Sequence, residues 1–406
     1  MSTIEFNLTK TRSAMRVAEF VAFVADTDTE QVLKRFVLEE AMPHVYIAIG
    51  NIGDAIAHLS KLERSPQFLL VDLHGSAMPL SDLGRLSEVC EPSVQVIALG
   101  ERNDVGLFRS LLKLGVRDYL VKPLTVELLK RTVNVSQGSV NQVSFARTGK
   151  AIAFAGTRGG VGVTTIAVNL ARYLAGETHR RVAYVDLNLS GGSANSMLGI
   201  QSTNGLWEVL QNVHRLDPQY LERTLVAKDQ RLFVLSAEQD FASTIEVEPT
   251  TFQRVLELLC NSFHYVFLDV DSARNPLAGA AFDLAKRVYV VSDRSVHSAR
   301  QCVRLLRHIE GRDNNPQTSV VLNSPNATTH GKVQSGDFAE AIGRAAQHEF
   351  HFEQRSLQVA ENLGERPKEK NPNGFNQSII RIADDLTGQI TKTESSLLSK
   401  VALWRK

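Results

Sequence analysis

The sequence predicts an α/β protein that consists of two doubly wound domains. The chain of 406 residues is too long for a single domain, because domains usually hold about 100 to 200 residues. Apolar runs rich in β-branched residues alternate with segments of helical periodicity, which is typical of parallel sheets covered by helices on both faces. In the second half, a glycine-rich turn between an apolar run and a helical segment indicates a loop that binds phosphate.

The composition is that of a soluble globular protein, with 43% hydrophobic and 22% charged residues. A net charge of +1 excludes an overall attraction to nucleic acid or acidic surfaces. It is still compatible with a local basic patch. Cys90, Cys260 and Cys302 are odd in number and lie in apolar segments, which fits a reducing cytosol better than a disulfide framework or a metal motif. Residues 1–16 lack the apolar core of a secretory signal, and no apolar stretch reaches the roughly 18 residues of a membrane span. Any membrane contact is therefore expected to be peripheral.

Five strands, each followed by a helical segment, are expected in the first half. Asp26 and Asp28 follow the first strand, Asp72 ends the third, and Lys122 follows the fifth. Ligands of such sheets bind outside the carboxyl ends of the strands. An acidic cluster that faces a lysine could hold Mg²⁺ and accept a phosphoryl group. The expected strands are Val17 to Val24, Val45 to Ile49, Phe68 to Leu73, Val94 to Leu99 and Tyr119 to Val121.

This pattern, together with the run GVRDYLVKPL after the fourth helix, resembles the receiver domain of response regulators, a flavodoxin-like fold. The resemblance covers residues 16–135. It implies that Asp72 is the phosphoacceptor, that Asp26 or Asp28 belongs to the metal pocket, and that Lys122 contacts the phosphate.

One landmark of the receiver family is missing. Receivers place a Ser or Thr after the fourth strand to bond the phosphoryl oxygen, whereas this sequence runs Ala98-Leu99-Gly100 and offers no hydroxyl. Two interpretations stay open. Either the receiver fold is kept as a dimerisation or docking module whose carboxylates cap strand ends, or Asp72 is a live phosphorylation site.

Residues 136–149 lose the periodicity and are rich in Ser, Gly, Gln and Asn, which is typical of an inter-domain linker. The expected boundaries are therefore 1–135 for the first domain and 150–391 for the second. A short tail, 392–406, follows the second domain.

The second domain is expected to begin with a strand, Ala151 to Ala155, a turn, GTRGGVGVTT, and a helix, Ile166 to Leu174. Glycines let the backbone turn tightly and approach phosphates, and the helix dipole adds positive potential. Thr164 or Thr165 can place a hydroxyl on Mg²⁺. The residues expected to contact the nucleotide are Arg158, Gly159, Gly160, Val161, Gly162, Val163, Thr164 and Thr165.

The turn resembles the deviant Walker A motif of the ParA/MinD class, which implies ATP and Mg²⁺ as ligands. Arg158 stands where that class has a lysine that reaches the partner's nucleotide across a dimer, and Val163 stands in place of the lysine on the β- and γ-phosphates. A charge-assisted hydrogen bond contributes about 1.5 to 3 kcal/mol, so its loss would weaken ATP binding by about one to two orders of magnitude. Hydrolysis is therefore expected to be weak or absent. A glycine turn that binds nothing stays an alternative.

The same resemblance assigns roles at three further strand ends. Asp186 would be the catalytic acid that orients the attacking water, with Asn188 where the class often has a second acid. Asp269 would hold Mg²⁺ together with Thr164, followed by a switch at 271–274. Asn323 would read the adenine edge.

The combination of both domains resembles the CpaE/TadZ proteins of Flp (tight adherence) pilus assembly. The resemblance implies a cytoplasmic homodimer at the cell pole or the inner face of the inner membrane. Its implied partners are a pilus or secretion ATPase and other pilus assembly proteins. Nucleic-acid binding is disfavoured, because the sequence shows no basic stripe and no helix-turn-helix signature.

The tail 392–406 is short and amphipathic, with Leu397, Val401 and Trp404 on one face and Lys400 among its basic residues. It could contact a membrane or pack on its own domain or a partner. The charged stretch 364–374 is expected to be a solvated loop without chemistry. Besides a localisation scaffold, a dimer-switch ATPase that uses Arg158 and Asp186 and a phosphorelay protein that uses Asp72 stay open.

Overall fold

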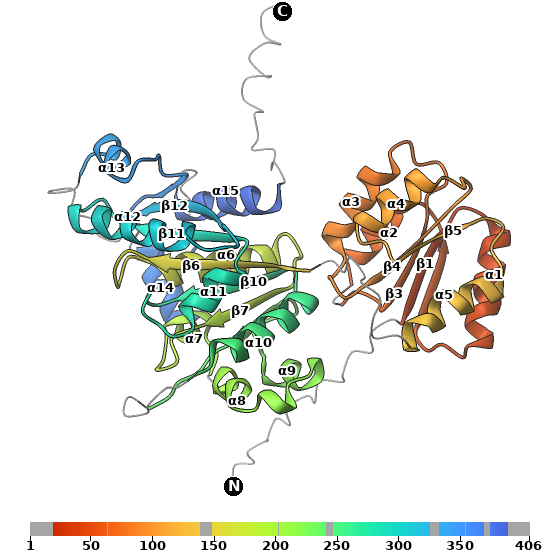
Figure 1. Ribbon diagram of the computed structural model, residues 1–406, viewed down its shortest axis with the longest axis horizontal. Helices are drawn as coiled ribbons and strands as arrows, with labels where there is room; N and C mark the ends of the chain where they lie inside the picture. Colours follow the sequence, from red (N-terminus) through yellow and green to blue (C-terminus); the bar gives the residue numbers. More distant parts are fainter. Residues whose placement is uncertain are drawn as a thin grey trace, which may run out of the picture. The chain divides into compact units, whose positions relative to one another are not determined.

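A computed structural model describes residues 19–62, 64–138, 148–201, 203–240, 247–324, 333–353, 355–368 and 374–388. The chain divides into two compact units, Met1–Arg147 and Thr148–Lys406, and each unit is a helix-covered sheet (Figure 1). Within the described ranges, no helix combines the length and apolarity that a membrane crossing requires. The amphipathic tail 392–406 lies outside the described residues.

The first unit contains a five-stranded parallel sheet with the order β2-β1-β3-β4-β5. This order is that of flavodoxin-like doubly wound folds, so the predicted fold class is confirmed. The strands are β1 (Phe20–Val24), β2 (Val45–Ile49), β3 (Phe68–Asp72), β4 (Gln95–Gly100) and β5 (Asp118–Val121). The helices are α1 (Thr27–Glu39), α2 (Ile52–Leu59), α3 (Pro79–Val89), α4 (Val105–Lys113) and α5 (Val126–Gly138).

Helices cover both faces of this sheet and bury its central strands. α1 and α5 pack on one face, whereas α2, α3 and α4 pack on the other. Every residue of β1 and β3 is buried, which explains why these strands read as continuous apolar runs rather than as alternating ones. The acidic residues at their carboxyl ends therefore sit at the rim of a double-sided core.

The second unit contains an eight-stranded sheet with the order β13-β12-β11-β6-β10-β7-β9-β8. All its strand pairs are parallel except β8 with β9. The strands are β6 (Lys150–Gly156), β7 (Val182–Asp186), β8 (Val226–Ala227), β9 (Leu232–Leu235), β10 (Tyr265–Val270), β11 (Arg287–Ser292), β12 (Gln317–Asn323) and β13 (His348–Phe350). The helices are α6 (Val163–Gly176), α7 (Ala194–Leu198), α8 (Gly205–Gln211), α9 (Pro218–Thr224), α10 (Pro249–Ser262), α11 (Ala278–Leu284), α12 (Val296–Glu310), α13 (Ser335–Ile342), α14 (Arg355–Leu363) and α15 (Phe375–Thr387), with one 3₁₀ turn at Val213–Arg215.

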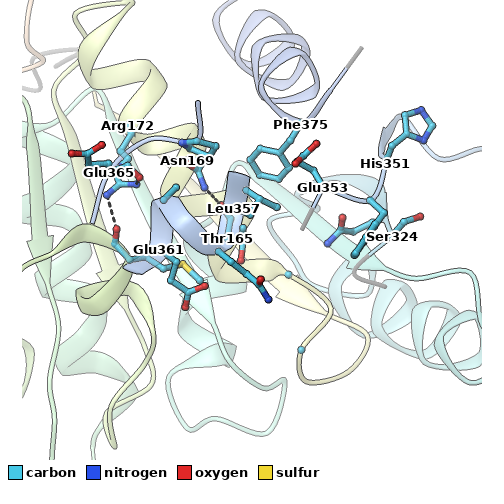
Figure 2. A pocket seen from close by; sticks show the side chains of 18 residues that line it. Thr165, Asn169, Arg172, Ser324, His351, Glu353, Leu357, Glu361, Glu365 and Phe375 are labelled. Carbon is cyan, nitrogen blue, oxygen red and sulfur yellow. Dashed lines mark hydrogen bonds between the residues drawn. The ribbon is translucent and has the colours of Figure 1, made fainter. Parts of the chain in front are cut away.

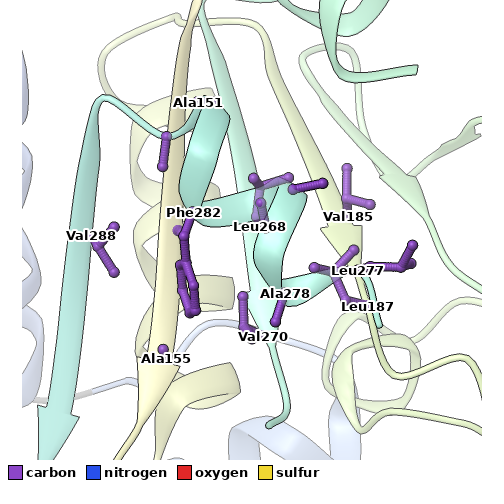
Figure 3. Packing of buried hydrophobic residues seen from close by; sticks show 14 of the residues in the cluster. Ala151, Ala155, Val185, Leu187, Leu268, Val270, Leu277, Ala278, Phe282 and Val288 are labelled. Carbon is purple, nitrogen blue, oxygen red and sulfur yellow. The ribbon is translucent and has the colours of Figure 1, made fainter. Parts of the chain in front are cut away.

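Two hydrophobic cores hold this sheet between its helices. One lies between the sheet and α8 to α13, and the other between the sheet and α6, α7 and α15. Figure 3 shows the first core, where Phe282 and Ala278 of α11 lie over Ala155 of β6 and Val270 of β10. This packing fixes β6, β7 and β10 side by side, so the residues at their carboxyl ends meet at one edge of the sheet.

Candidate functional sites

The loop between β6 and α6 has the backbone shape of a glycine-dependent turn. Gly160 and Gly162 adopt left-handed conformations with φ of 72° and 98°, which other residues rarely adopt. A Cβ atom on Gly162 would lie 2.3 Å from Nδ2 of Asn323, so the position also lacks room for a side chain. A strand, a tight turn and a helix N-terminus thus follow one another, the arrangement that favours phosphate binding.

Val163, the first residue of α6, supplies no charge to this loop. Its side chain packs against the apolar core that contains Val161 and Ile166. It also lies against Gly156, where an added Cβ would approach Val163 Cγ2 to 2.8 Å. Any bound phosphate would therefore depend on backbone N–H groups, the helix N-terminus and a cation rather than on this side chain.

Arg158 pairs with an acidic residue of its own chain. Its Nε and Nη2 both donate to Asp293 Oδ2, with Nε at 2.9 Å. The other oxygen of Asp293 accepts a hydrogen bond from Ser295 Oγ at 2.8 Å. Burial opposes the ionisation of Asp293, but hydrogen bonds from Arg158, Ser298 and Ser295 hold its pKa below the ordinary value. The guanidinium that the resemblance assigned to a partner's nucleotide is thus engaged within its own subunit.

Asp186 and Asp269 form a buried pair of carboxylates on neighbouring strands. They are register partners of β7 and β10, and each is about 3% exposed. Tyr184 donates its hydroxyl to Asp269 Oδ2 at 2.6 Å. Burial raises the pKa of Asp269, although hydrogen bonds from Tyr184 and Thr164 oppose the shift. Burial, and then repulsion from Asp269, raises the pKa of Asp186 to about 8.

This pair fits Mg²⁺ by its donor set. Asp186 Oδ1 accepts the N–H of Asn188 at 3.0 Å, whereas the buried Oδ2 has no hydrogen-bond partner among the described residues. Carboxylate and hydroxyl oxygens from Asp186, Asp269 and Thr164 are hard ligands that suit this cation. In the described part of the chain, no three His, Cys, Asp or Glu side chains form a metal cluster of their own. Mg²⁺ is usually held by one or two carboxylates together with water and phosphate, and Asp186 and Asp269 supply two.

A cavity of about 320 Å³ opens beside the phosphate loop (Figure 2). Gly160, Gly162 and Thr165 line one side, and α14 with the segment after it lines the other. Asn323 also lines the cavity, and its Nδ2 donates to the carbonyl of Val161 at 2.8 Å. The cavity therefore joins the loop to the residue that the resemblance assigned to the adenine edge.

Arg172 is a buried residue of this site that the sequence analysis missed. Its guanidinium donates to the carbonyls of Met197 at 2.5 Å, Gly364 at 2.8 Å and Glu365 at 2.6 Å. Burial lowers its pKa to about 10. These bonds tie α6 to the end of α7 and to the far wall of the cavity. An arginine within a continuous apolar helix was the only signal for this role in the sequence.

The stretch 364–374 was expected to be a solvated loop, and this prediction is wrong for its first residues. Gly364 and Pro367 are buried. Arg366 forms an ion pair with Glu177 at 2.6 Å and also donates to the carbonyl of Arg172. The segment packs as a wall of the cavity because buried and paired side chains anchor it on α6.

In the first unit, Lys122 joins two of the predicted acidic residues. Its Nζ lies 2.5 Å from Asp26 Oδ2 and 2.6 Å from Asp72 Oδ2. The side chain of Asp72 is 1% exposed, and its oxygens also accept the N–H groups of Ala25 at 3.1 Å and His74 at 2.9 Å. The Lys122 hydrogen bond, aided by the N–H of Thr29, lowers the pKa of Asp26 to about 2. Lys122 thus bridges the two carboxylates and offsets one of their two negative charges.

The structure separates the two candidates for the metal pocket. Asp26 joins Lys122, whereas Asp28 lies exposed in the first turn of α1. The missing hydroxyl at Gly100 also has a structural reason. A Cβ there would lie 2.4 Å from the hydroxyl of Tyr119, which donates to the carbonyl of Arg102 at 2.9 Å. Tyr119 therefore fills the space that a Ser or Thr side chain would need.

Comparison with known proteins supports this geometry. Residues 149–320 match the family model described as AAA domain. The chromosome-partitioning ATPase Soj of Thermus thermophilus is 32% identical over 168 residues, 39% of this chain and 61% of the relative. A probable C4-dicarboxylate response regulator, DctR of Halalkalibacterium halodurans, is 30% identical over 113 residues, 27% of this chain and 47% of the relative. The chain thus spans about three fifths and about half of these two relatives.

Solved structures give the same fold for the larger unit. A ParA family ATPase from Chlorobium tepidum TLS aligns over 58% of this chain and 98% of its own, with a TM-score of 0.52 and 19% identity. The second unit has the fold of ParA and MinD ATPases. The septum site-determining protein MinD of Pyrococcus horikoshii, solved with Mg-ADP, aligns over 58% of this chain and 95% of its own, with a TM-score of 0.50 and 18% identity. A further match covers a shorter stretch and does not bear on the fold of the larger unit. It is a CpaE2 pilus assembly protein from Sinorhizobium meliloti, which aligns over 28% of this chain and 96% of its own, with a TM-score of 0.26 and 28% identity.

Proposed function

We propose that this chain is a nucleotide-binding localisation and assembly factor that dimerises with ATP and hydrolyses it slowly or not at all. The observation that carries the proposal is a glycine loop without a lysine that lines a cavity and that is linked to a buried acid pair through the hydrogen bond of Thr164 to Asp269. The relation to Soj and the Mg-ADP in a MinD of the same fold support an adenine nucleotide with Mg²⁺ as the ligand.

The residues of the second unit would share the binding of Mg-ATP. The loop 159–162 would supply backbone N–H groups to the phosphates, and Asn323 would contact the base from the cavity wall. Thr164, Asp269 and Asp186 would hold Mg²⁺, with Asp186 also beside the attacking water. When bound, Mg²⁺ neutralises charge on the phosphates and on this acid pair.

Slow hydrolysis is proposed for two reasons. Val163 places no positive charge near the position of the transferred phosphate. Arg158 is paired with Asp293, so it would have to leave an ion pair before it could reach a partner's nucleotide. Positively charged groups that contact the transferred phosphoryl group are a main source of catalysis in such sites, because they stabilise its negatively charged oxygens.

The resemblance to CpaE/TadZ supports a place in a Flp pilus or related secretion machine. We propose that the dimer positions a pilus or secretion ATPase at the cell pole, on the cytoplasmic side of the inner membrane. Membrane contact would be peripheral.

For the first unit, a docking or dimerisation module is favoured over a phosphorelay. Tyr119 fills the space above Gly100, so no hydroxyl can bond a phosphoryl group there, and Lys122 occupies Asp72 Oδ2 at 2.6 Å. Transfer of phosphate from acetyl phosphate to the chain, lost on Asp72→Asn, would favour the phosphorelay instead.

The proposal is tested by equilibrium binding of ATP and ADP to the purified chain with and without Mg²⁺. The oligomeric state is followed by light scattering at each nucleotide concentration. We expect binding of Mg-ATP that is coupled to dimer formation, with little phosphate release. Absence of binding at millimolar ATP would mean that the second unit is a scaffold without a nucleotide.

Replacement of Val163 by lysine is expected to tighten ATP binding by about ten- to a hundredfold, because a charge-assisted hydrogen bond to phosphate is added. Val163→Met is the matched control, since it is long and flexible but uncharged. Titration calorimetry of both variants checks the prediction. Equal affinities for the two variants would show that the phosphates do not lie at the start of α6.

A further inference from the structure

The outward face of α12 carries no acidic side chain. Glu310, the single acidic residue of the helix, is engaged with Arg344 at 2.7 Å and with the hydroxyl of Thr318 at 2.6 Å. The sequence analysis found no basic stripe, because the three arginines are separated by two or three uncharged residues and only the helix brings them to one face. The fully exposed residues of α12 are Val296, His297, Arg300, Arg304, Arg307 and His308.

Three of these residues form what we call the basic face of α12: Arg300, Arg304 and Arg307. Spacings of four and three residues place them on one side of the helix, along about 10 Å of its axis. Among the residues that the structure describes, none of the three guanidiniums forms an ion pair with Asp or Glu. Arg304 donates to Gln301 at 3.3 Å, a neutral neighbour one turn back.

The other arginines around this helix behave differently. Arg312, just after α12, pairs with Asp283. Arg344, just after α13, pairs with Glu310. The protein therefore neutralises the arginines beside the basic face and leaves the face itself charged.

The acidic residues around the basic face favour a partner whose negative charge is confined to a narrow strip. α13 packs beside α12 and exposes Asp337 and Glu340, and the exposed Asp313 follows α12. A wide anionic surface, such as a duplex or a bilayer, would meet these carboxylates and be repelled. The net charge of +1 adds no long-range attraction. Three phosphate contacts alone would give weak, strongly salt-dependent binding.

We propose that the basic face of α12 docks an acidic helix of a partner protein. Carboxylates at every third or fourth position of such a helix would lie in line with Arg300, Arg304 and Arg307. Guanidinium groups bind carboxylates through two parallel hydrogen bonds, which gives the contact its specificity. None of the three arginines lines the nucleotide cavity, so this surface goes beyond the proposed nucleotide-binding function.

The test uses the full chain and two synthetic helical peptides of equal composition. One peptide carries glutamates at every third or fourth position along one face, and the other spreads the same glutamates around the helix. Binding is followed by fluorescence anisotropy at low salt. We expect the one-faced peptide to bind at least about fivefold more tightly, because only it matches the spacing of the basic face.

The variant Arg300→Gln/Arg304→Gln/Arg307→Gln is expected to bind the one-faced peptide at least about tenfold more weakly. The matched control, Arg215→Gln/Arg223→Gln/Arg254→Gln, removes three exposed arginines elsewhere in the second unit and should stay within about twofold of the parent chain. Far-ultraviolet circular dichroism on heating confirms that both variants fold.

Three results would overturn the proposal. One is equal loss of binding in both triple variants, which would indicate a general charge effect. Another is no binding of the one-faced peptide, or equal binding of the two peptides. The third is tighter binding of a DNA duplex or of phosphatidylglycerol vesicles that depends on Arg300, Arg304 and Arg307, which would make the partner a nucleic acid or a membrane. Nucleotide is absent throughout, so these outcomes are independent of ATP binding.

Discussion

Replacement of Lys122 by methionine is expected to destabilise the first unit by about 3 kcal/mol, because it leaves a buried carboxylate without its counter-charge. Asp72 is 1% exposed, and Lys122 lies 2.6 Å from it. Two backbone N–H groups would remain on Asp72 and limit the loss. Asp26 would contribute little, since its side chain is 43% exposed and water can replace the lysine.

Hydrogen exchange of β1 and β3 in the full chain measures this loss for the first unit alone. Lys130→Met is the matched control, because Lys130 also bridges two carboxylates, Glu39 at 3.0 Å and Glu40 at 3.1 Å, but on the surface. Its cost should be much smaller than that of Lys122→Met, because exposed ion pairs contribute little. Addition of Asp72→Asn to Lys122→Met should recover part of the stability. An equal cost for both lysine variants would contradict the prediction.

Replacement of Asp186 by asparagine is expected to stabilise the nucleotide-free protein above pH 8 and to remove a pH dependence. The pKa of Asp186 is about 8 in the fold, against 3.8 for the free side chain. Between these values the folded state binds the extra proton, so the free energy of unfolding falls as the pH rises. The loss is complete about one pH unit above the folded pKa and amounts to at most about 6 kcal/mol. Asparagine stays neutral and avoids it.

Urea unfolding between pH 5 and pH 9, in the absence of Mg²⁺, checks this prediction. Asp313→Asn is the control, because Asp313 is exposed, carries the same charge and is not among the groups that raise the pKa of Asp186. At high pH, addition of Mg²⁺ with nucleotide should raise the free energy of unfolding of the parent chain. The same addition should raise that of Asp186→Asn less. Parallel pH profiles for the parent chain and Asp186→Asn would mean that the carboxyl group is ionised in the fold without cost.

The folds of both units could be predicted from local patterns. Continuous apolar runs such as Phe68–Asp72 occur in strands that are buried on both faces, and the structure confirms them. The strand-end acids Asp72, Asp186 and Asp269 could be found in the same way, because the carboxyl ends of parallel strands meet at one edge. The chain positions of these residues carry that information without any tertiary contact.

The choice between Asp26 and Asp28 could not be predicted. Both follow the same strand, and only the start of α1 decides which one turns toward Lys122 and which one faces solvent. The role of Arg172 could not be predicted for a related reason. Its position in an apolar helix is visible in the sequence, but its acceptors are backbone carbonyls that carry no side-chain signal.

The sequence by itself determined the two α/β architectures, the glycine turn and the residue types at the strand ends, because periodicity and turn chemistry act over a few neighbouring residues. Only the tertiary structure decided that Arg158 pairs with Asp293, 135 positions away, and that Lys122 joins Asp26 across 96 positions. It likewise decided that three arginines of α12 have no ion pair with any described residue, whereas the neighbouring Arg312 and Arg344 are paired. Such contacts depend on the directions in which side chains of distant segments point once the sheets are packed. Short-range sequence patterns do not determine those directions.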